Sequence, residues 1–252
     1  MGVLEGAHGA VELRRGWKLL VLSFVIGLCC LFAFSTVRAD SRVRSPMDFH
    51  ATVLNQDLVG SAFALSDTVI VTNAHVVEGR RPGDTVRLIS SDGSDRRAMA
   101  EVVAISRMMD LAILGAPRGF LPPVRSGMVQ NHSGLKIVAA GVDASGGAHS
   151  GERLALWGAV SIPRKNIDVF GPGLIADIPG VRPGFSGGPV LDREGRLVGM
   201  LTAIRNKKTG LKSSGSRVQV ASEQADEAYV LRASALRSEV DRLLRRVVSL
   251  AR

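Results

Sequence analysis

Short stretches of apolar and β-branched residues recur along most of the chain, and turn residues separate them. Runs of this length, bounded by glycine, proline or aspartate, are typical of β-strands. They predict strands at residues 51–54, 61–65, 68–72, 85–89, 100–106, 111–114, 136–141, 154–161, 174–177, 189–191, 197–203 and 227–231. Turns are expected at residues 81–84, 92–93, 171–173 and 192–195. Many evenly spaced strands favour an all-β barrel or sandwich.

The C-terminal segment has a different pattern. Apolar residues recur there at spacings of three and four, which predicts one buried face of a helix at about residues 234–250. Ser234 is a candidate N-cap. This helix is expected to pack on the β domain, and a membrane-surface or partner-binding helix is the alternative.

The N-terminus carries an uncharged apolar run at residues 19–34, preceded by Lys18 and followed by small or compact residues at Val37 and Ala39. The run is shorter than the roughly 20 residues that span a bilayer. It is typical of an export signal cut after Ala39, with an uncleaved membrane anchor as the alternative. The chain is therefore expected in the periplasm or cell envelope, either soluble or tethered through residues 19–34.

The composition excludes several classes of function. The 252 residues carry a net charge of +9 and two cysteines, Cys29 and Cys30, both inside the apolar run. Two cysteines cannot build a disulfide scaffold or a four-cysteine zinc site. His50, His132 and His149 have no metal-ligand spacing and are expected on the surface, so neither a metal nor a cofactor is predicted. Aromatic residues make up only 4%, which argues against base stacking on nucleic acid.

A basic stretch at residues 205–212 has two interpretations. It is expected to be a solvated loop. The alternative is a surface that steers acidic substrates or envelope polyanions. Short basic runs of this kind do not predict nucleic-acid binding.

Three short motifs carry candidate chemistry. His75 follows a predicted strand, Asp110 precedes one, and Ser186 lies in a Gly-Phe-Ser-Gly-Gly-Pro turn. Each alone is an ordinary turn residue. Together, in the order His, Asp and Ser, they supply what amide hydrolysis needs: a nucleophile, a base, and an anion that orients the base.

The glycines around Ser186 meet a further need. They allow the N–H groups of Gly184 and Ser186 to point at one spot, where the oxyanion of a tetrahedral intermediate would lie. Side chains at Gly184 or Gly187 would crowd this approach.

With these motifs, the sequence resembles the trypsin-like (chymotrypsin-fold) serine proteases, specifically the bacterial HtrA/Deg branch. The similarity extends beyond the triad to residues 59–63, 156–161, 197–203 and 228–231. It implies two packed six-stranded antiparallel barrels with a C-terminal helix. Residues 1–39 would be the signal peptide or anchor, and 40–252 the protease domain. Barrel one would cover about 48–122, barrel two about 126–232 and the helix about 234–250.

The resemblance also implies substrate-binding residues. Thr202, Ala203 and Ile204 would pair with the substrate backbone as an added strand, and the Thr202 hydroxyl would help hold Asp110. Protein or peptide substrates are the implied partners, and the oligomeric state stays open.

Three departures from the family pattern stand out. Phe185 replaces the aspartate that pairs with a new N-terminus in digestive enzymes, so activation of that kind is not expected. Residues 141–147 replace the family's usual Asn-Pro-Phe-Gly stretch. The chain ends about 20 residues after its closing strand, so a peptide-binding PDZ domain is not expected.

The favoured hypothesis is an exported serine endopeptidase that works through an acyl-enzyme. His75 would be its base, Asp110 its orienting group and Ser186 its nucleophile, with an oxyanion hole at Gly184 and Ser186. The first alternative is a protease-like binding or chaperone module of the envelope with little turnover. The second is a membrane-tethered adaptor whose basic surface binds polyanions.

Overall fold

The computed structural model describes residues 44–125, 127–145, 151–206, 210–213 and 225–250. The predicted export segment, both cysteines and His149 lie outside these residues. Within the described part of the chain, no helix is both long enough and apolar enough to cross a bilayer.

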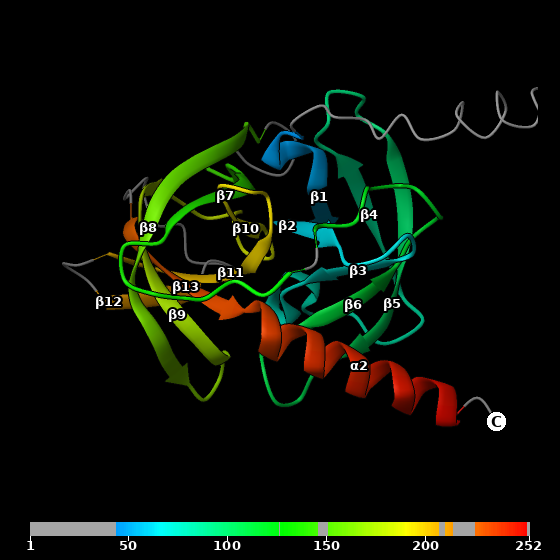
Figure 1. The fold of residues 1–252 in the computed structure, drawn as a ribbon. Helices are drawn as coiled ribbons and strands as arrows, with labels where there is room; N and C mark the ends of the chain where they lie inside the picture. Colours follow the sequence, from blue (N-terminus) through cyan, green and yellow to red (C-terminus); the bar gives the residue numbers. More distant parts are fainter. Residues whose placement is uncertain (1–43, 126, 146–150, 207–209, 214–224, 251–252) are drawn as a thin grey trace, which may run out of the picture. The chain divides into compact units, whose positions relative to one another are not determined.

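Six antiparallel strands form the first barrel, closed in the order β1-β2-β3-β6-β5-β4 (Figure 1). The ring closes where β1 pairs with β4. A short 3-10 helix, η1 (Pro46–Phe49), leads into the barrel, and another, η2 (Ala74–Val77), follows its third strand. The strands are β1 (His50–Asn55), β2 (Leu58–Ala64), β3 (Val69–Thr72), β4 (Thr85–Ser90), β5 (Arg97–Ile105) and β6 (Ala112–Gly115).

The second barrel is closed in the order β10-β7-β8-β9-β13-β11, because β10 pairs with both β7 and β11. An additional strand, β12, pairs with β11 outside this ring. The strands are β7 (Lys136–Val142), β8 (Arg153–Ile167), β9 (Gly171–Val181), β10 (Pro189–Asp192), β11 (Leu197–Asn206), β12 (Gly210–Ser213) and β13 (Ala225–Arg232). The predicted fold, two six-stranded antiparallel barrels with a C-terminal helix, is confirmed.

Each barrel has its own apolar core, and a third cluster joins them. Val53, Leu88 and Leu114 belong to the core of the first barrel, and Ile137 and Val198 to that of the second. The third cluster combines side chains from both barrels with the C-terminal helix, including Phe63, Leu111, Val138, Met200 and Leu236. The seam between the barrels is therefore packed, which fixes the residues that both barrels present there.

Helix α2 (Ala233–Leu250) follows β13 directly and contacts β11, β13 and β5. Leu236, Val240 and Leu243 are buried in the joining cluster, so the prediction that this helix packs on the β domain is confirmed. The helix begins at Ala233, so Ser234 lies inside its first turn and the prediction of an N-cap there was wrong. Its last turns carry the exposed Val247 and Val248.

Two further expectations need correction. Residues 171–173 do not form a turn but open β9, because Gly171 and Gly173 pair with Ile167 and Lys165 of β8. His50 is not on the surface: it is fully buried in β1. This strand pairs with β2 and β4 and also contacts β7 of the second barrel, so neither of its faces meets water at His50. His132 is exposed, as predicted.

Candidate active site

His75 lies in η2, immediately after β3, and Asp110 lies in the turn between β5 and β6. Because β3 and β6 are paired, these two loops emerge side by side. The His75 Nδ1–H donates to Asp110 Oδ2 (2.6 Å), and the His75 backbone N–H donates to Oδ1 (3.1 Å). Two bonds to one carboxylate fix the ring's orientation and tautomer, leaving the lone pair on Nε2.

Asn73 is hydrogen-bonded to Asp110 and links it to Thr202. It is fully buried, and its side-chain amide donates to the Asp110 carbonyl (2.7 Å) and to Thr202 Oγ1 (3.2 Å). The Thr202 hydroxyl donates to the Met200 carbonyl (3.2 Å), so in this structure it reaches Asp110 through Asn73 and not through the carboxylate. Sequence reasoning missed Asn73, although its place two residues before His75 was the available signal.

Ser186 lies in the turn between β9 and β10 and is almost completely buried. Its hydroxyl donates to the carbonyl of Thr202 on β11 (3.3 Å). His75 Nε2 is buried and has no hydrogen-bond partner among the described residues. The structure therefore brings together His75, Asp110, Asn73 and Thr202, and joins Ser186 to this group through Thr202 rather than through the imidazole.

The glycine positions of the Ser186 turn are required by its geometry. Gly184 (φ +98°) and Gly187 (φ +87°) both have backbone conformations that disfavour side chains. A Cβ at Gly184 would overlap the Val142 carbonyl oxygen, and one at Gly187 would overlap that of Ser61. The turn thus lies directly against β7 and β2, and these contacts exclude side chains at both positions.

The backbone hydrogen bonds around Gly184 and Ser186 bear on the two predicted oxyanion donors. Ala144 N–H donates to the Pro183 carbonyl (3.0 Å), which turns that carbonyl toward residues 142–145. In a trans peptide the N–H of Gly184 points the opposite way. Within the described residues, neither Gly184 N–H nor Ser186 N–H donates to a backbone carbonyl.

An ion pair ties the same turn to the loop that replaces the family's usual stretch. Arg182 Nη1 lies 2.7 Å from Asp143 Oδ2, and the Ser145 N–H donates to Asp143 Oδ1 (2.8 Å). Burial alone would raise the pKa of Asp143, but these hydrogen bonds and the Arg182 charge outweigh it and lower the pKa. A charged Asp143 therefore anchors the segment in front of Gly184.

The residues of β11 that are expected to pair with the substrate already have a neighbouring strand on each side. Ala203 pairs with Tyr229 of β13 and Ser213 of β12, and Ile204 pairs with Ala228 and Lys212 of the same strands. A peptide could add to β11 at these residues only in place of β12. Sequence reasoning missed β12 because its four residues have no apolar alternation.

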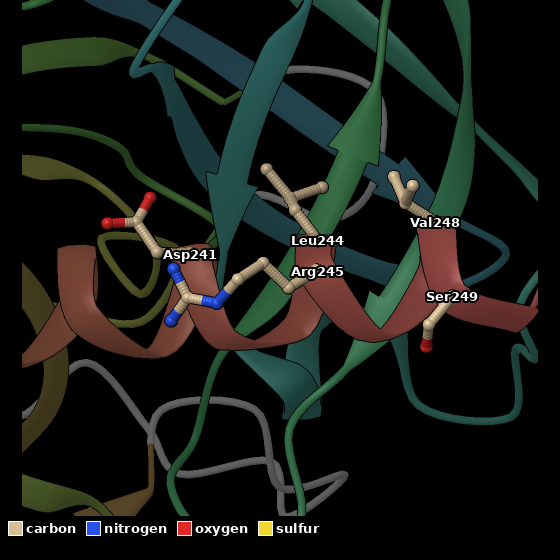
Figure 2. A pocket seen from close by; sticks show the side chains of 5 residues that line it. All are labelled: Asp241, Leu244, Arg245, Val248 and Ser249. Carbon is tan, nitrogen blue, oxygen red and sulfur yellow. The ribbon is translucent and has the colours of Figure 1, made fainter.

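Two other features bear on ligands. No cluster of three or more His, Cys, Asp or Glu side chains that could hold a metal occurs within the described residues. A depression lies on the C-terminal helix α2 (Figure 2). It is lined by Asp241, Leu244, Arg245, Val248 and Ser249.

Taken together, two closed antiparallel barrels, a His–Asp pair on the first and a serine in a glycine turn on the second define the chymotrypsin-like architecture. The profile of the trypsin-like peptidase domain matches residues 60–200, more than half of the sequence. The chain belongs to the trypsin-like peptidase family.

Similar proteins point to the HtrA/DegP-like branch. A serine protease of Synechocystis named HhoB is 33% identical over 166 residues, covering 60% of this chain and 36% of that protein. A DegP-like periplasmic serine endoprotease of Halomonas elongata is 31% identical over 174 residues, covering 67% and 35%. This chain thus spans about a third of the length of both relatives.

A solved structure shares the fold. The HtrA-type protease AlgW, solved with a tripeptide, superposes with a TM-score of 0.62 at 21% identity, covering 79% of this chain and 63% of that one.

Proposed function

We propose that this chain is an exported serine endopeptidase in which Ser186 is the nucleophile, His75 the base and Asp110 the orienting group. The observation that carries the proposal is the buried, unpartnered Nε2 of His75, held in the acceptor tautomer by Asp110. Such an acceptor is suited to take a proton from a serine hydroxyl. Ser186 is joined to the same group of residues through Thr202.

The proposed reaction needs one movement before chemistry. The Ser186 hydroxyl turns from the Thr202 carbonyl to His75 Nε2 by rotation about its Cα–Cβ bond. Ser186 Oγ then attacks the scissile carbonyl carbon while Nε2 takes its proton. The N–H groups of Gly184 and Ser186 donate to the oxyanion that forms. Collapse expels the amine, which takes the proton from His75, and leaves an acyl-enzyme that water hydrolyses by the same route.

Cleavage of an unfolded protein tests this proposal. The full chain should cut casein, and the Ser186→Ala and His75→Ala variants should not. An additional Asn131→Ala variant serves as a control that should cut like the wild type. Asn131 lies in the segment that links β6 of the first barrel to β7 of the second. Folded wild-type protein that leaves casein intact would contradict the proposal.

The structure also favours a second candidate, a binding or chaperone module with little turnover. The observations for it are the Ser186 hydroxyl bonded to Thr202 and the substrate edge of β11 occupied by β12. This candidate predicts that the chain suppresses aggregation of unfolded casein without cleaving it, and that Ser186→Ala suppresses it equally well.

Export is the remaining part of the proposal, and it rests on the apolar run at residues 19–34 and the compact residues Val37 and Ala39. Fractionation of expressing cells, followed by N-terminal sequencing, should find the protein in the envelope fraction and beginning at Asp40 if the signal is cleaved. An intact N-terminus in the membrane fraction would indicate the anchor instead. Recovery only from the cytoplasm would contradict export.

A further inference from the structure

A second histidine, His50, is fully buried and takes no part in the proposed reaction. Both of its ring nitrogens are hydrogen-bonded to serines. Nδ1 lies 2.7 Å from Ser91 Oγ, and Nε2 lies 2.8 Å from Ser61 Oγ. Buried polar groups that are fully paired fix the positions of their neighbours.

The donors and acceptors in this series of hydrogen bonds, from Ser91 through His50 to Ser61, have one consistent assignment. The Ser61 hydroxyl donates to the Gly184 carbonyl (2.7 Å), so Ser61 Oγ must accept from His50 Nε2–H. The Ser91 hydroxyl then donates to Nδ1. Burial, with a smaller contribution from the charge of Arg153, lowers the pKa of His50 to about 3, so the ring is neutral at pH 7.

Ser61 holds the Ser186 turn at two points. Its hydroxyl bonds to the Gly184 carbonyl, and its backbone N–H donates to the Ser186 carbonyl (2.8 Å). The two residues held in this way are the same two whose N–H groups form the proposed oxyanion hole. Ser61 is on the first barrel and the turn is on the second, so this clamp also crosses the seam.

We propose that Ser91, His50 and Ser61 form a buried relay that positions the oxyanion hole, with His50 and Ser61 as positioning residues. The proposal deepens the proposed endopeptidase function and rests on it. Its physical basis is that oxyanion donors act only when they are held in place before the transition state forms. His50 holds the Ser61 hydroxyl at 2.8 Å, together with a longer bond from the Val142 N–H (3.3 Å), and the hydroxyl in turn holds the Gly184–Phe185 peptide.

Steady-state kinetics on a peptide substrate test the relay. In Ser61→Ala and His50→Leu, kcat should fall by about 10- to 100-fold, since a misplacement of about 1 Å costs about that much. KM should stay within about twofold, because the oxyanion forms after binding. Ser90→Ala is the matched control: Ser90 is a buried serine of the same barrel whose hydroxyl bonds to Asp92, outside the relay, so kcat should not change.

Two comparisons separate positioning from a general loss of stability. A glutamine at position 50 carries an NH2 group that can donate to Ser61 and a carbonyl oxygen that can accept from Ser91, so His50→Gln should recover most of the kcat lost in His50→Leu. Because both residues act through one chain of bonds, the Ser61→Ala/His50→Leu double variant should be no slower than the slower single variant. An active wild type with unchanged kcat in both single variants would overturn the relay, as would multiplicative losses in the double variant.

A structural measurement keeps the relay testable if the wild type proves inert. In the Ser186→Ala background, 15N-glycine labelling should show that the Gly184 amide resonance shifts in Ser61→Ala and His50→Leu but not in Ser90→Ala. A Gly184 resonance that is the same in all of these proteins would overturn the relay. An inert wild type whose Gly184 resonance shifts as expected would overturn only the endopeptidase function.

Discussion

At the scale of single residues, close packing explains why the site's glycines cannot be replaced. Gly187 combines a positive φ with a position where any Cβ would overlap the Ser61 carbonyl oxygen. A side chain at position 187 would therefore destabilise the fold in two ways, through its backbone conformation and through its contact with Ser61. A comparison with another glycine of similar φ can separate the two effects.

We expect Gly187→Ala to lower the free energy of unfolding by more than the roughly 1–3 kcal/mol typical of backbone strain alone. Gly83→Ala is the matched control, because Gly83 has a similar φ (+96°) with nothing within 4 Å of an added Cβ. Urea unfolding measures both variants. Equal losses would show that the contact with Ser61 contributes nothing.

His50 gives stability a defined pH dependence. Its pKa is about 3 in the folded chain and 6.5 when unperturbed, so the unfolded state binds the proton more readily between these values. The free energy of unfolding should therefore fall as pH drops from about 6.5 to 3. His50→Gln, which has no titrating group, should show a smaller fall over this range. Parallel curves for the two proteins would contradict the burial of a neutral His50.

At the scale of elements, helix α2 is joined to the loop that presents Asp110. The buried Glu239 accepts a hydrogen bond from Ser106 Oγ, and Arg242 donates to the same carboxylate (2.7 Å). Ser106 Oγ in turn accepts from the N–H groups of Met108 (3.0 Å) and Met109 (3.3 Å), just before Asp110. The hydrogen bond from Arg242 is the main cause that lowers the pKa of Glu239.

Glu239→Ala should lower the free energy of unfolding by about 1–3 kcal/mol, because it leaves a buried hydroxyl without its acceptor. Glu101→Ala, an exposed glutamate of β5, is the control and should change it by less than about 0.5 kcal/mol. Urea unfolding of both variants checks this, and equal small effects would show that the helix does not brace the Asp110 loop.

Strand β12 raises a separate expectation, since it occupies the edge of β11 proposed for substrate. Lys212→Pro removes a backbone donor and disfavours that pairing. The KM for peptides should fall about tenfold, as two freed main-chain hydrogen bonds contribute about 0.7 kcal/mol each. Lys212→Ala keeps the backbone and should leave KM unchanged. An unchanged or raised KM in the proline variant would place the substrate elsewhere.

The strands were predictable from sequence because apolar, β-branched runs with turn signals mark them directly, and the triad candidates stood in short motifs. His50 was not predictable, because its burial depends on β7 covering β1 from the second barrel. The same holds for Ser61, whose role arises only where the Ser186 turn folds against β2. Two further elements were not predicted, because neither shows a periodic pattern of apolar residues in the sequence. They are the 3-10 helix that carries His75 and the additional strand β12.

At the scale of the whole molecule, the two barrels divide the proposed catalytic residues between them. The first supplies His75 and Asp110, and the second supplies Ser186, Gly184 and Thr202. The packed cluster between the barrels and the hydrogen bonds from Ser61 and Asn73 hold these halves in register. We therefore expect substitutions that disturb the contacts between the barrels to lower activity as much as substitutions in any single loop.

Labelling by a fluorophosphonate probe tests the central claim most directly, because the probe reacts with a serine only when it is activated as a nucleophile. The full chain should be labelled at Ser186, with labelling abolished in Ser186→Ala and strongly reduced in His75→Ala. Circular dichroism would show that all three proteins are folded. Folded wild-type protein that remains unlabelled, or labelling that survives Ser186→Ala, would contradict the account.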